Sequence, residues 1–311
     1  MIAESSMGRG SVVVTGGSGF IGRAVVAALC ARGCRVVVVD RADPVHDDER
    51  VTHIQGELSD PGVREAAVRE DTEGIVHLAA MTSVLRSVET PEQTYVDNVA
   101  VTQQLLELAR QRGVGRFVFA STNAVVGNVG ERTITPEMPL RPLTPYGATK
   151  AACEMLLSGY AGAYDMATCA LRLTNVYGPG MSHKDSFVPR LMRAALRGDG
   201  VRVYGGGLQR RDLVHLDDVV RAILLSLDAG YCGTAIVGSG RSVSVLEMVT
   251  AAREATGAQL PAEHVPAPQG EMPAVMVDVS GSAAAFGYRP SVGLADGLAG
   301  VWRHFRENGT C

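Results

Sequence analysis

Short apolar runs alternate with amphipathic stretches along the first half of the chain. Residues 11–15 (SVVVT) form an apolar run that leads into Gly16, and apolar residues recur at spacings of three and four from Ile21 to Leu29. This pattern predicts a strand, a turn and a helix. Gly33 ends the predicted helix, and the unbroken β-branched run from Val36 to Val39 is typical of a parallel strand buried on both faces. The pattern therefore predicts a β-α-β unit.

The same alternation continues to about residue 175. It predicts further strands at 51–55, 75–78, 116–120 and 167–173, and further helices at 63–70, at 91–112 and after Thr144-Pro145. Thr is a good N-cap, and Pro is favoured in the first turn of a helix. Repeated units of this length predict an α/β fold built on a doubly wound parallel sheet of the Rossmann type.

The sequence pattern changes beyond Asn175. Loops rich in Gly and Pro, at 177–180, 204–207 and 261–273, separate short helices and strands. We therefore expect residues 1–175 to form the large sheet and residues 176–311 to form mainly a smaller α/β lobe. Some segments of the second part are expected to cross back to the first.

Composition narrows the classes of partner. The chain has 311 residues with 29 basic and 33 acidic side chains, a net charge of −4, and it contains no Lys/Arg-rich run. We therefore expect neither nucleic acid nor an anionic membrane as a partner. There is no stretch of about 18 or more apolar residues, and residues 1–10 lack the features of a signal peptide. These observations favour a cytoplasmic protein.

Cysteine and histidine spacing gives no sign of a metal site. The six cysteines form no C-x-x-C pair, and no ligand-like Cys/His spacing occurs. We expect free thiols and no structural metal at Cys30, Cys34, Cys153, Cys169, Cys232 and Cys311.

A glycine-rich segment joins the first predicted strand to the first predicted helix. Residues 15–22 (TGGSGFIG) satisfy both G-x-x-G-x-x-G and G-x-G-x-x-G. Such a turn lets backbone N–H groups approach a pyrophosphate at the positive end of the helix. Asp40 ends the second strand, where a carboxylate accepts hydrogen bonds from the adenosine ribose of NAD and repels the 2′-phosphate of NADP. Arg41 would favour NADP, and Asp40 is also a common turn residue; on balance we expect NAD.

Tyr146 and Lys150 lie four residues apart at the start of the helix predicted after Thr144. They share one helix face. A phenol, whose pKa is ordinarily about 10, becomes a usable base near neutral pH when a neighbouring ammonium stabilises the phenolate. A strand that ends in Ser121-Thr122 precedes this helix. The pattern indicates a candidate acid–base site.

At this point the chain resembles the extended short-chain dehydrogenase/reductase family, and within it the NAD-dependent nucleotide-sugar epimerases and dehydratases. The resemblance covers nearly the whole chain and rests on TGGSGFIG (15–22), VHLAA (76–80), DNV (97–99), ASTNAVVG (120–127), PYGATK (145–150), RLTNVYGPG (172–180) and QRRDLVHLDDV (209–219). It implies NAD as cofactor, a nucleotide sugar as substrate and hydride removal from the sugar C4. It also implies a homodimer built on two helices of each subunit, those near 91–112 and 145–160. Leu105, Leu108 and Ala109 form an apolar stripe on the first of these helices, although core packing explains it equally well.

The resemblance also implies roles for individual residues. Tyr146 would be the base, Lys150 would lower the pKa of Tyr146 and hold the nicotinamide ribose, and Thr122 would bond the reacting sugar oxygen. The implied cofactor-binding residues are Gly16, Gly19, Phe20, Ile21, Gly22, Asp40, Arg41, Glu57, Leu58, Leu78, Ala79, Ala80, Asn98, Ser121, Tyr146 and Lys150. The implied substrate-binding residues are Thr82, Arg86, Thr122, Asn123, Asn175, Val188, Val203, Tyr204 and Arg211.

The residues after Thr122 bear on the reaction. The family's 4,6-dehydratases have Asp and Glu there, whereas this chain has Asn123 and Ala124, which cannot shuttle protons. We therefore favour a 4-epimerase acting on a UDP-hexose or UDP-uronic acid. A dehydratase or 4-ketoreductase of the same family is the alternative, and a non-catalytic dinucleotide sensor is a remote one.

Several positions depart from the family pattern or stay open. Pro273 stands where a phosphate-binding Arg is expected after Gly270-Glu271-Met272, so that role could pass to Arg210. Val126 replaces a usual Tyr. Arg211 could simply pair with Asp212 or Asp217, and Tyr204 could simply pack. Three basic residues are expected in loops near the sugar, namely Arg86, His183 and Lys184. They could hold a uronate carboxylate or could merely be solvated.

Overall fold

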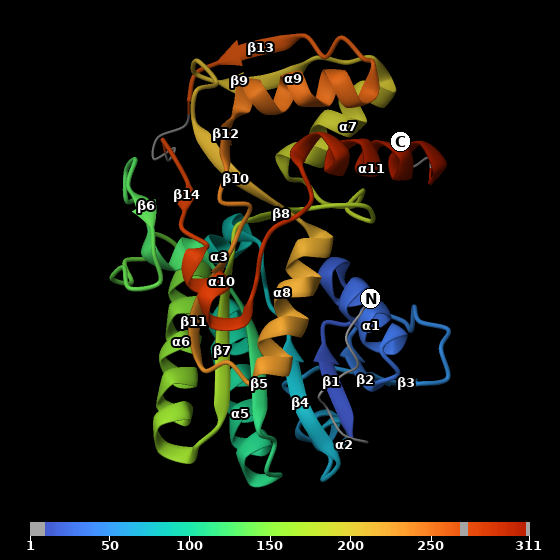
Figure 1. Ribbon diagram of the computed structural model, residues 1–311, viewed down its shortest axis with the longest axis vertical. Helices are drawn as coiled ribbons and strands as arrows, with labels where there is room; N and C mark the ends of the chain where they lie inside the picture. Colours follow the sequence, from blue (N-terminus) through green and yellow to red (C-terminus); the bar gives the residue numbers. More distant parts are fainter. Residues whose placement is uncertain (1–9, 268–272, 309–311) are drawn as a thin grey trace.

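The computed structural model describes residues 10–267 and 273–308, and a seven-stranded sheet is its largest element (Figure 1). The strand order is β11-β7-β5-β4-β1-β2-β3, and every neighbouring pair is parallel. The strands are β1 (Ser11–Thr15), β2 (Arg35–Asp40), β3 (Val51–Gln55), β4 (Thr72–His77), β5 (Arg116–Thr122), β7 (Ala167–Leu173) and β11 (Gly233–Val237). The predicted parallel α/β sheet is confirmed.

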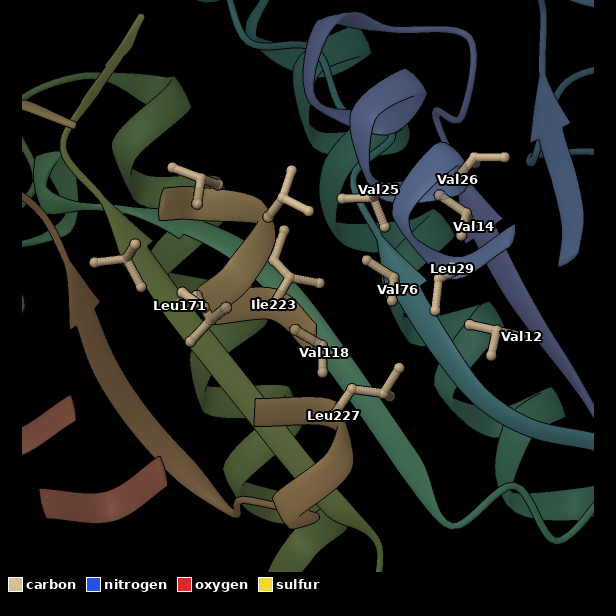
Figure 2. Packing of buried hydrophobic residues seen from close by; sticks show 14 of the residues in the cluster. Val12, Val14, Val25, Val26, Leu29, Val76, Val118, Leu171, Ile223 and Leu227 are labelled. Carbon is tan, nitrogen blue, oxygen red and sulfur yellow. The ribbon is translucent and has the colours of Figure 1, made fainter. Parts of the chain in front are cut away.

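Helices cover both faces of this sheet. On one face lie α1 (Phe20–Ala31) and α8 (Leu216–Ala229), and Figure 2 shows their side chains packed against the strands. On the other face lie α2 (Pro61–Ala67), α5 (Val101–Gln111) and α6 (Pro145–Tyr164). In β1 the side chains of Val12 and Val14 point to the first core and that of Val13 to the second. Burial on both faces explains the unbroken apolar runs of these strands.

A smaller lobe lies above the carboxyl ends of the strands (Figure 1). It contains a three-stranded sheet in the order β12-β10-β8 and a parallel pair β13-β9. Helices α7, α9 and α11 pack together with β9 in one apolar core. These elements are β8 (Asn175–Tyr177), α7 (Phe187–Arg197), β9 (Val201–Tyr204), β10 (Arg210–His215), β12 (Ser242–Ser244), α9 (Val245–Thr256), β13 (Ala262–Val265) and α11 (Leu294–Glu307).

The chain passes between the two lobes more than once. After β10 it returns to the large sheet with α8 and β11, and after β13 it returns with α10 (Ser280–Phe286), whose Phe286 joins the α1–α8 core. A parallel pair of β6 (Thr133–Ile134) and β14 (Met276–Val277) ties the two halves of the sequence at one side. The division near residue 175 stays a prediction; that point lies between β7 and β8.

Two predicted helices differ in detail from the structure. The helix predicted over 91–112 contains a π turn, η1 (Val96–Ala100), between α4 (Pro91–Tyr95) and α5. The helix predicted over 63–70 is α2, which begins earlier because the Asp60 carboxylate accepts from the Gly62 N–H and Pro61 occupies the first turn. The helix expected after Thr144 is confirmed as α6, with the Thr144 hydroxyl accepting from the Gly147 N–H at 3.2 Å. The short helix α3 (Val84–Glu89) had no predicted counterpart.

Within the described residues no helix is long and apolar enough to cross a membrane. That part of the chain also holds no cluster of His, Cys, Asp and Glu side chains suited to a metal ion. Its five cysteines are free thiols, four of them buried; Cys311 lies outside the described residues.

A buried ion pair fixes α6 to the sheet. The Arg172 guanidinium of β7 donates to both carboxylate oxygens of Glu154 in α6, and the two side chains are 4% and 1% exposed. The Ser121 hydroxyl at the end of β5 donates to the same carboxylate, and Arg172 also donates to the Pro136 carbonyl. The pair therefore joins α6, β5, β7 and the loop between β6 (Thr133–Ile134) and α6.

We expect Glu154→Ala to lower the free energy of unfolding by about 3–5 kcal/mol, because it leaves the Arg172 charge buried without its partner. Denaturant unfolding followed by circular dichroism measures the change. The matched control is Glu263→Ala, since the Arg202–Glu263 pair is exposed on both sides and 3.7 Å long, and it should change little. Equal effects of the two substitutions would contradict this account of the pair.

Candidate active site

A cavity of about 1060 Å³ lies where the carboxyl ends of the large sheet meet the smaller lobe. Gly16 follows β1, Asp40 ends β2, Leu78 follows β4 and Thr122 ends β5, and all four line the cavity. Binding sites of doubly wound sheets lie at this edge because parallel strands all end there. All but four of the site residues expected from the sequence line this cavity.

The glycine turn forms one end of the cavity. Gly16 has a φ of +70°, and a Cβ there would lie 2.8 Å from the Ala79 nitrogen; a Cβ on Gly22 would lie 2.1 Å from the Gly16 oxygen. Side chains at these positions would push the turn open. Gly19 caps α1 without a side-chain hydrogen bond, and the first turn of α1 carries no acidic residue. The first N–H groups of α1 are therefore free of a competing side-chain anion, which fits the diphosphate of a dinucleotide.

Asp40 holds this turn and faces the cavity. Its carboxylate accepts from the Ser18 N–H and from the Ala42 N–H, both at 3.0 Å. A carboxylate has about four acceptor positions, so it keeps capacity for ribose hydroxyls. Arg41, which would suit a 2′-phosphate, lies 3.6 Å from the Glu57 carboxylate. The residues present fit NAD.

Thr122 and Tyr146 meet in the lining of the cavity. Burial raises the pKa of Tyr146, and a hydrogen bond between its hydroxyl and the Thr122 side chain opposes that rise. The Thr122 hydroxyl also accepts from the Ala124 N–H at 3.2 Å, which fixes its orientation. If a substrate hydroxyl binds beside these two side chains, Thr122 can hydrogen-bond to it and the phenol of Tyr146 can accept or return its proton.

Lys150 lies one turn of α6 after Tyr146 and is almost fully buried. Its ammonium donates to the Ala120 carbonyl at 2.8 Å and lies 4.4 Å from the centre of the Phe119 ring. Burial lowers the pKa of Lys150 to about 8, although the charges of Cys153 and Glu154 act in the opposite direction. The ammonium is thus held by β5, next to the end of the strand that carries Thr122.

Asn98 supports the site without lining it. Its side chain is 2% exposed, accepts from the Met81 N–H at 2.8 Å and donates to the Thr149 hydroxyl at 2.9 Å. The π turn η1 thereby connects the segment after β4 to α6. Because these bonds occupy its amide and Asn98 is not part of the cavity lining, its implied cofactor contact stays a prediction.

Three other expected residues also lie outside the cavity lining. Arg86 is exposed on α3. Asn123 is buried, with its amide donating to the Leu173 carbonyl at 3.3 Å. Val203 is fully buried in the core of the smaller lobe, whereas Arg202 and Tyr204 line the cavity. Successive side chains of a strand point to opposite faces. The sequence alone could therefore have shown that Val203 and Tyr204, which are neighbours in β9, do not both face the cavity.

The smaller lobe contributes Asn175, Val188 and Arg211 to the cavity. The Asp212 carboxylate accepts from Thr174 and Ser239, and the Asn175 amide donates to the Asp212 carbonyl. Arg211 donates to the Arg210 carbonyl at 2.8 Å. These bonds hold the ends of β8 and β10 side by side at the cavity.

The contacts of Arg210 do not support the possible reassignment of the phosphate role to it. The Arg210 guanidinium donates to the Ser242 carbonyl and is not part of the cavity lining. Pro273 lies beside it, with its carbonyl accepting from the Arg210 N–H at 2.9 Å, while Gly270-Glu271-Met272 lie outside the described residues. Val126 is buried in a small core with Ile134 and Ile236.

The cavity is more basic than the chain as a whole. Six cationic side chains line it, against three acidic ones, Asp40, Glu57 and Asp97, although the net charge of the chain is −4. The cationic residues are Arg41, Lys150, Lys184, Arg190, Arg202 and Arg211. Arg190 and Arg202 were not expected from the sequence, because neither lies in a local motif. This excess of positive charge suits ligands that carry diphosphates.

Comparison with known proteins agrees with this geometry. Residues 12–237 match the model of a family described as "NAD dependent epimerase/dehydratase family". A UDP-glucose 4-epimerase of Mycolicibacterium smegmatis is 33% identical, covering 95% of this chain and 98% of its own. A dTDP-glucose 4,6-dehydratase of Actinoplanes sp. is 32% identical, covering 96% and 98%. The solved structure of MoeE5 in complex with UDP-glucuronic acid and NAD has a TM-score of 0.86 and 37% identity, covering 96% of this chain and 100% of that one.

We expect Lys150→Met to abolish turnover but to raise the free energy of unfolding at pH 7 by about 1–3 kcal/mol, because it removes a buried charge. The folded pKa, about 8, lies below the ordinary 10.5, so the unfolded chain binds more protons between these values. Lys150 therefore makes the unsubstituted protein more stable as the pH rises through that range, and the advantage of Met should shrink by pH 10. Denaturant unfolding at pH 7 and pH 10 measures both; a constant difference would contradict the assignment.

Proposed function

Because the chain belongs to the NAD dependent epimerase/dehydratase family, we propose that it is a nucleotide-sugar 4-epimerase that acts on a UDP-hexose or UDP-uronic acid through a transient 4-keto sugar. The family contains both 4-epimerases and 4,6-dehydratases at similar identity to this chain. The choice between them therefore rests on the side chains of the cavity.

One observation carries the proposal. The acidic residues of the cavity lie at the end of β2, just after β3 and on η1, and none lies on the cavity-lining part of β5 or η2 (Asn123–Val126) next to Thr122. Loss of water from a 4-keto sugar needs an acid and a base at C5 and C6. The positions directly after Thr122 offer Asn123, buried against Leu173, and Ala124. An epimerase needs no such pair.

The proposed roles follow the geometry of the site. Tyr146 takes the proton of the sugar 4-hydroxyl when C4 is oxidised and returns it when C4 is reduced, with Thr122 bonded to the same oxygen. We assign to the Lys150 ammonium the role of favouring the charged form of the phenol by its positive field, which must overcome the burial that raises the pKa of Tyr146. When bound, NAD supplies the redox chemistry, accepting a hydride from C4 and giving it back.

Epimerisation also requires that the keto sugar expose its other face. The proposal assigns the diphosphate to Arg211 and Asn175, and the nucleotide to Val188 and Tyr204. The nucleoside diphosphate then stays bound while the keto sugar rotates. MoeE5 has been solved with UDP-glucose and with UDP-glucuronic acid, which supports a UDP-sugar and leaves both sugar classes in the proposal. A dehydratase is the second candidate, supported by the relatives that catalyse that reaction.

The purified protein, with no added cofactor, should convert one member of a panel of UDP-, dTDP- and GDP-sugars to a product of unchanged mass with an inverted C4 signal in proton NMR. Tyr146→Phe should lower this turnover by at least about a thousandfold, since it removes the proton acceptor. It should leave bound NAD in place. A product lighter by one water, or a fully active Tyr146→Phe variant, would refute the proposal.

We further propose a homodimer. Exposed apolar side chains gather on helices that pack beside α6: Leu85 and Val88 on α3, Tyr95 on α4, and Met155 and Tyr164 on α6 itself. Their exposed fractions run from 50% to 79%. In the stripe of Leu105, Leu108 and Ala109, the first and last are buried in the core and Leu108 packs against it, which agrees with the core-packing explanation. Clustered exposed apolar groups of this kind mark association surfaces.

Light scattering should give twice the chain mass of 32.7 kDa, and the double variant Leu85→Asp/Met155→Asp should give the single chain mass, because two charges would be buried at the contact. Leu208→Asp is the matched control, since Leu208 is 74% exposed in the smaller lobe. A dimer that survives the double variant would exclude this surface.

A further inference from the structure

Lysine is almost absent from this chain. Of its 29 basic residues, 27 are Arg and two are Lys, namely Lys150 and Lys184. Both line the same cavity, although one lies in α6 and the other in the loop between β8 and α7. In a chain that otherwise carries its positive charge on Arg, the two exceptions are brought together by the fold.

Lysine and arginine differ in ways that matter inside a cavity. The ammonium is compact and has three donors on a flexible stem, whereas the guanidinium is a broad planar fork. Burial lowers the pKa of Lys184 as it does that of Lys150. A half-buried ammonium is costly unless an anion lies beside it.

The position of Lys184 shows which part of the cavity its charge faces. Its ammonium lies 5.9 Å from the centre of the Phe20 ring. Phe20 is the first residue of α1 and directly follows Gly19, the N-cap of that helix. Lys184 therefore lies beside the side chain of the first residue of α1, and both residues line the cavity, whereas Arg86 does not.

The loop that carries Lys184 is held by its own contacts. The Arg193 guanidinium of α7 donates to the carbonyls of Ser182 and Lys184 at 2.9 and 3.0 Å. The neighbouring carboxylate, Asp185, accepts two hydrogen bonds from Arg190, at 2.8 and 2.7 Å. Among the hydrogen bonds and ion pairs of residues 10–267 and 273–308, none includes the Lys184 ammonium. Asp185 is thus directed to Arg190 and does not neutralise Lys184.

We propose that Lys184 is a cofactor-binding residue whose ammonium binds the diphosphate of NAD from the side opposite the first turn of α1. The turn supplies neutral N–H donors, and Lys184 supplies the full positive charge that the turn lacks. This assignment replaces the expectation that Lys184 and exposed His183 hold a sugar carboxylate. It rests on the cofactor site and not on which reaction the protein catalyses.

The test measures NAD on the purified protein without any substrate. NAD per chain is determined after acid release, and its rate of exchange is followed with isotope-labelled NAD in solution. Lys184→Gln removes the charge and keeps a polar side chain that is one atom shorter; Lys184→Met is a second variant, with an apolar side chain. Arg197→Gln is the matched control, since Arg197 is exposed at the end of α7 and outside the cavity lining. Thermal unfolding of each variant reports its folding.

Both Lys184 variants should exchange NAD roughly tenfold faster or more, the loss expected for one charge-assisted contact, while Arg197→Gln stays unchanged. Salt should speed exchange in the unsubstituted protein more than in Lys184→Gln. Unchanged NAD content and exchange in folded Lys184→Gln would overturn the proposal, and a raised KM for the nucleotide sugar in that case would assign the ammonium to the substrate diphosphate instead.

Discussion

The site depends on one constraint, namely that all seven strands of the large sheet run in the same direction. Their carboxyl ends therefore meet at one edge, which brings the glycine turn after β1, Asp40 of β2 and Thr122 of β5 to one cavity. The helix α6 must lie against β5 for Tyr146 and Lys150 to reach that edge. The buried contacts of Glu154 with Arg172 and Ser121 hold it there, one turn beyond Lys150.

Charge distribution is the second determinant. The chain is acidic overall, yet its cavity carries twice as many cationic as acidic side chains. A dinucleotide and a nucleotide sugar each bring a diphosphate, so a site for both must supply positive charge from several segments. The structure supplies it from α6, from the β8–α7 loop, and from α7, β9 and β10.

Local patterns were sufficient to predict the large sheet and the cofactor end of the site. Strand, turn, helix and second strand follow one another within residues 11–40, so periodicity and glycine spacing alone predict where Gly16 and Asp40 lie. The other wall of the cavity is built from segments far apart in sequence, so Arg190 and Arg202 carry no local signal. Asn98 and Val203 were included because they lie in or near motifs, yet they are not part of the cavity lining. A motif gives the position of a residue but not the direction of its side chain. The alternation of β9 could have shown this for Val203, whereas the π turn that directs Asn98 to Met81 and Thr149 has no sequence signature.

The central claim is that the hydrogen removed from the sugar C4 returns to the same carbon on its other face. A substrate deuterated at C4, incubated with the protein and examined by deuterium and proton NMR, tests it most directly. The account predicts a product of unchanged mass with the deuterium still at C4 and the configuration inverted. Deuterium found at C6 of a dehydrated product, or lost from C4, would contradict it.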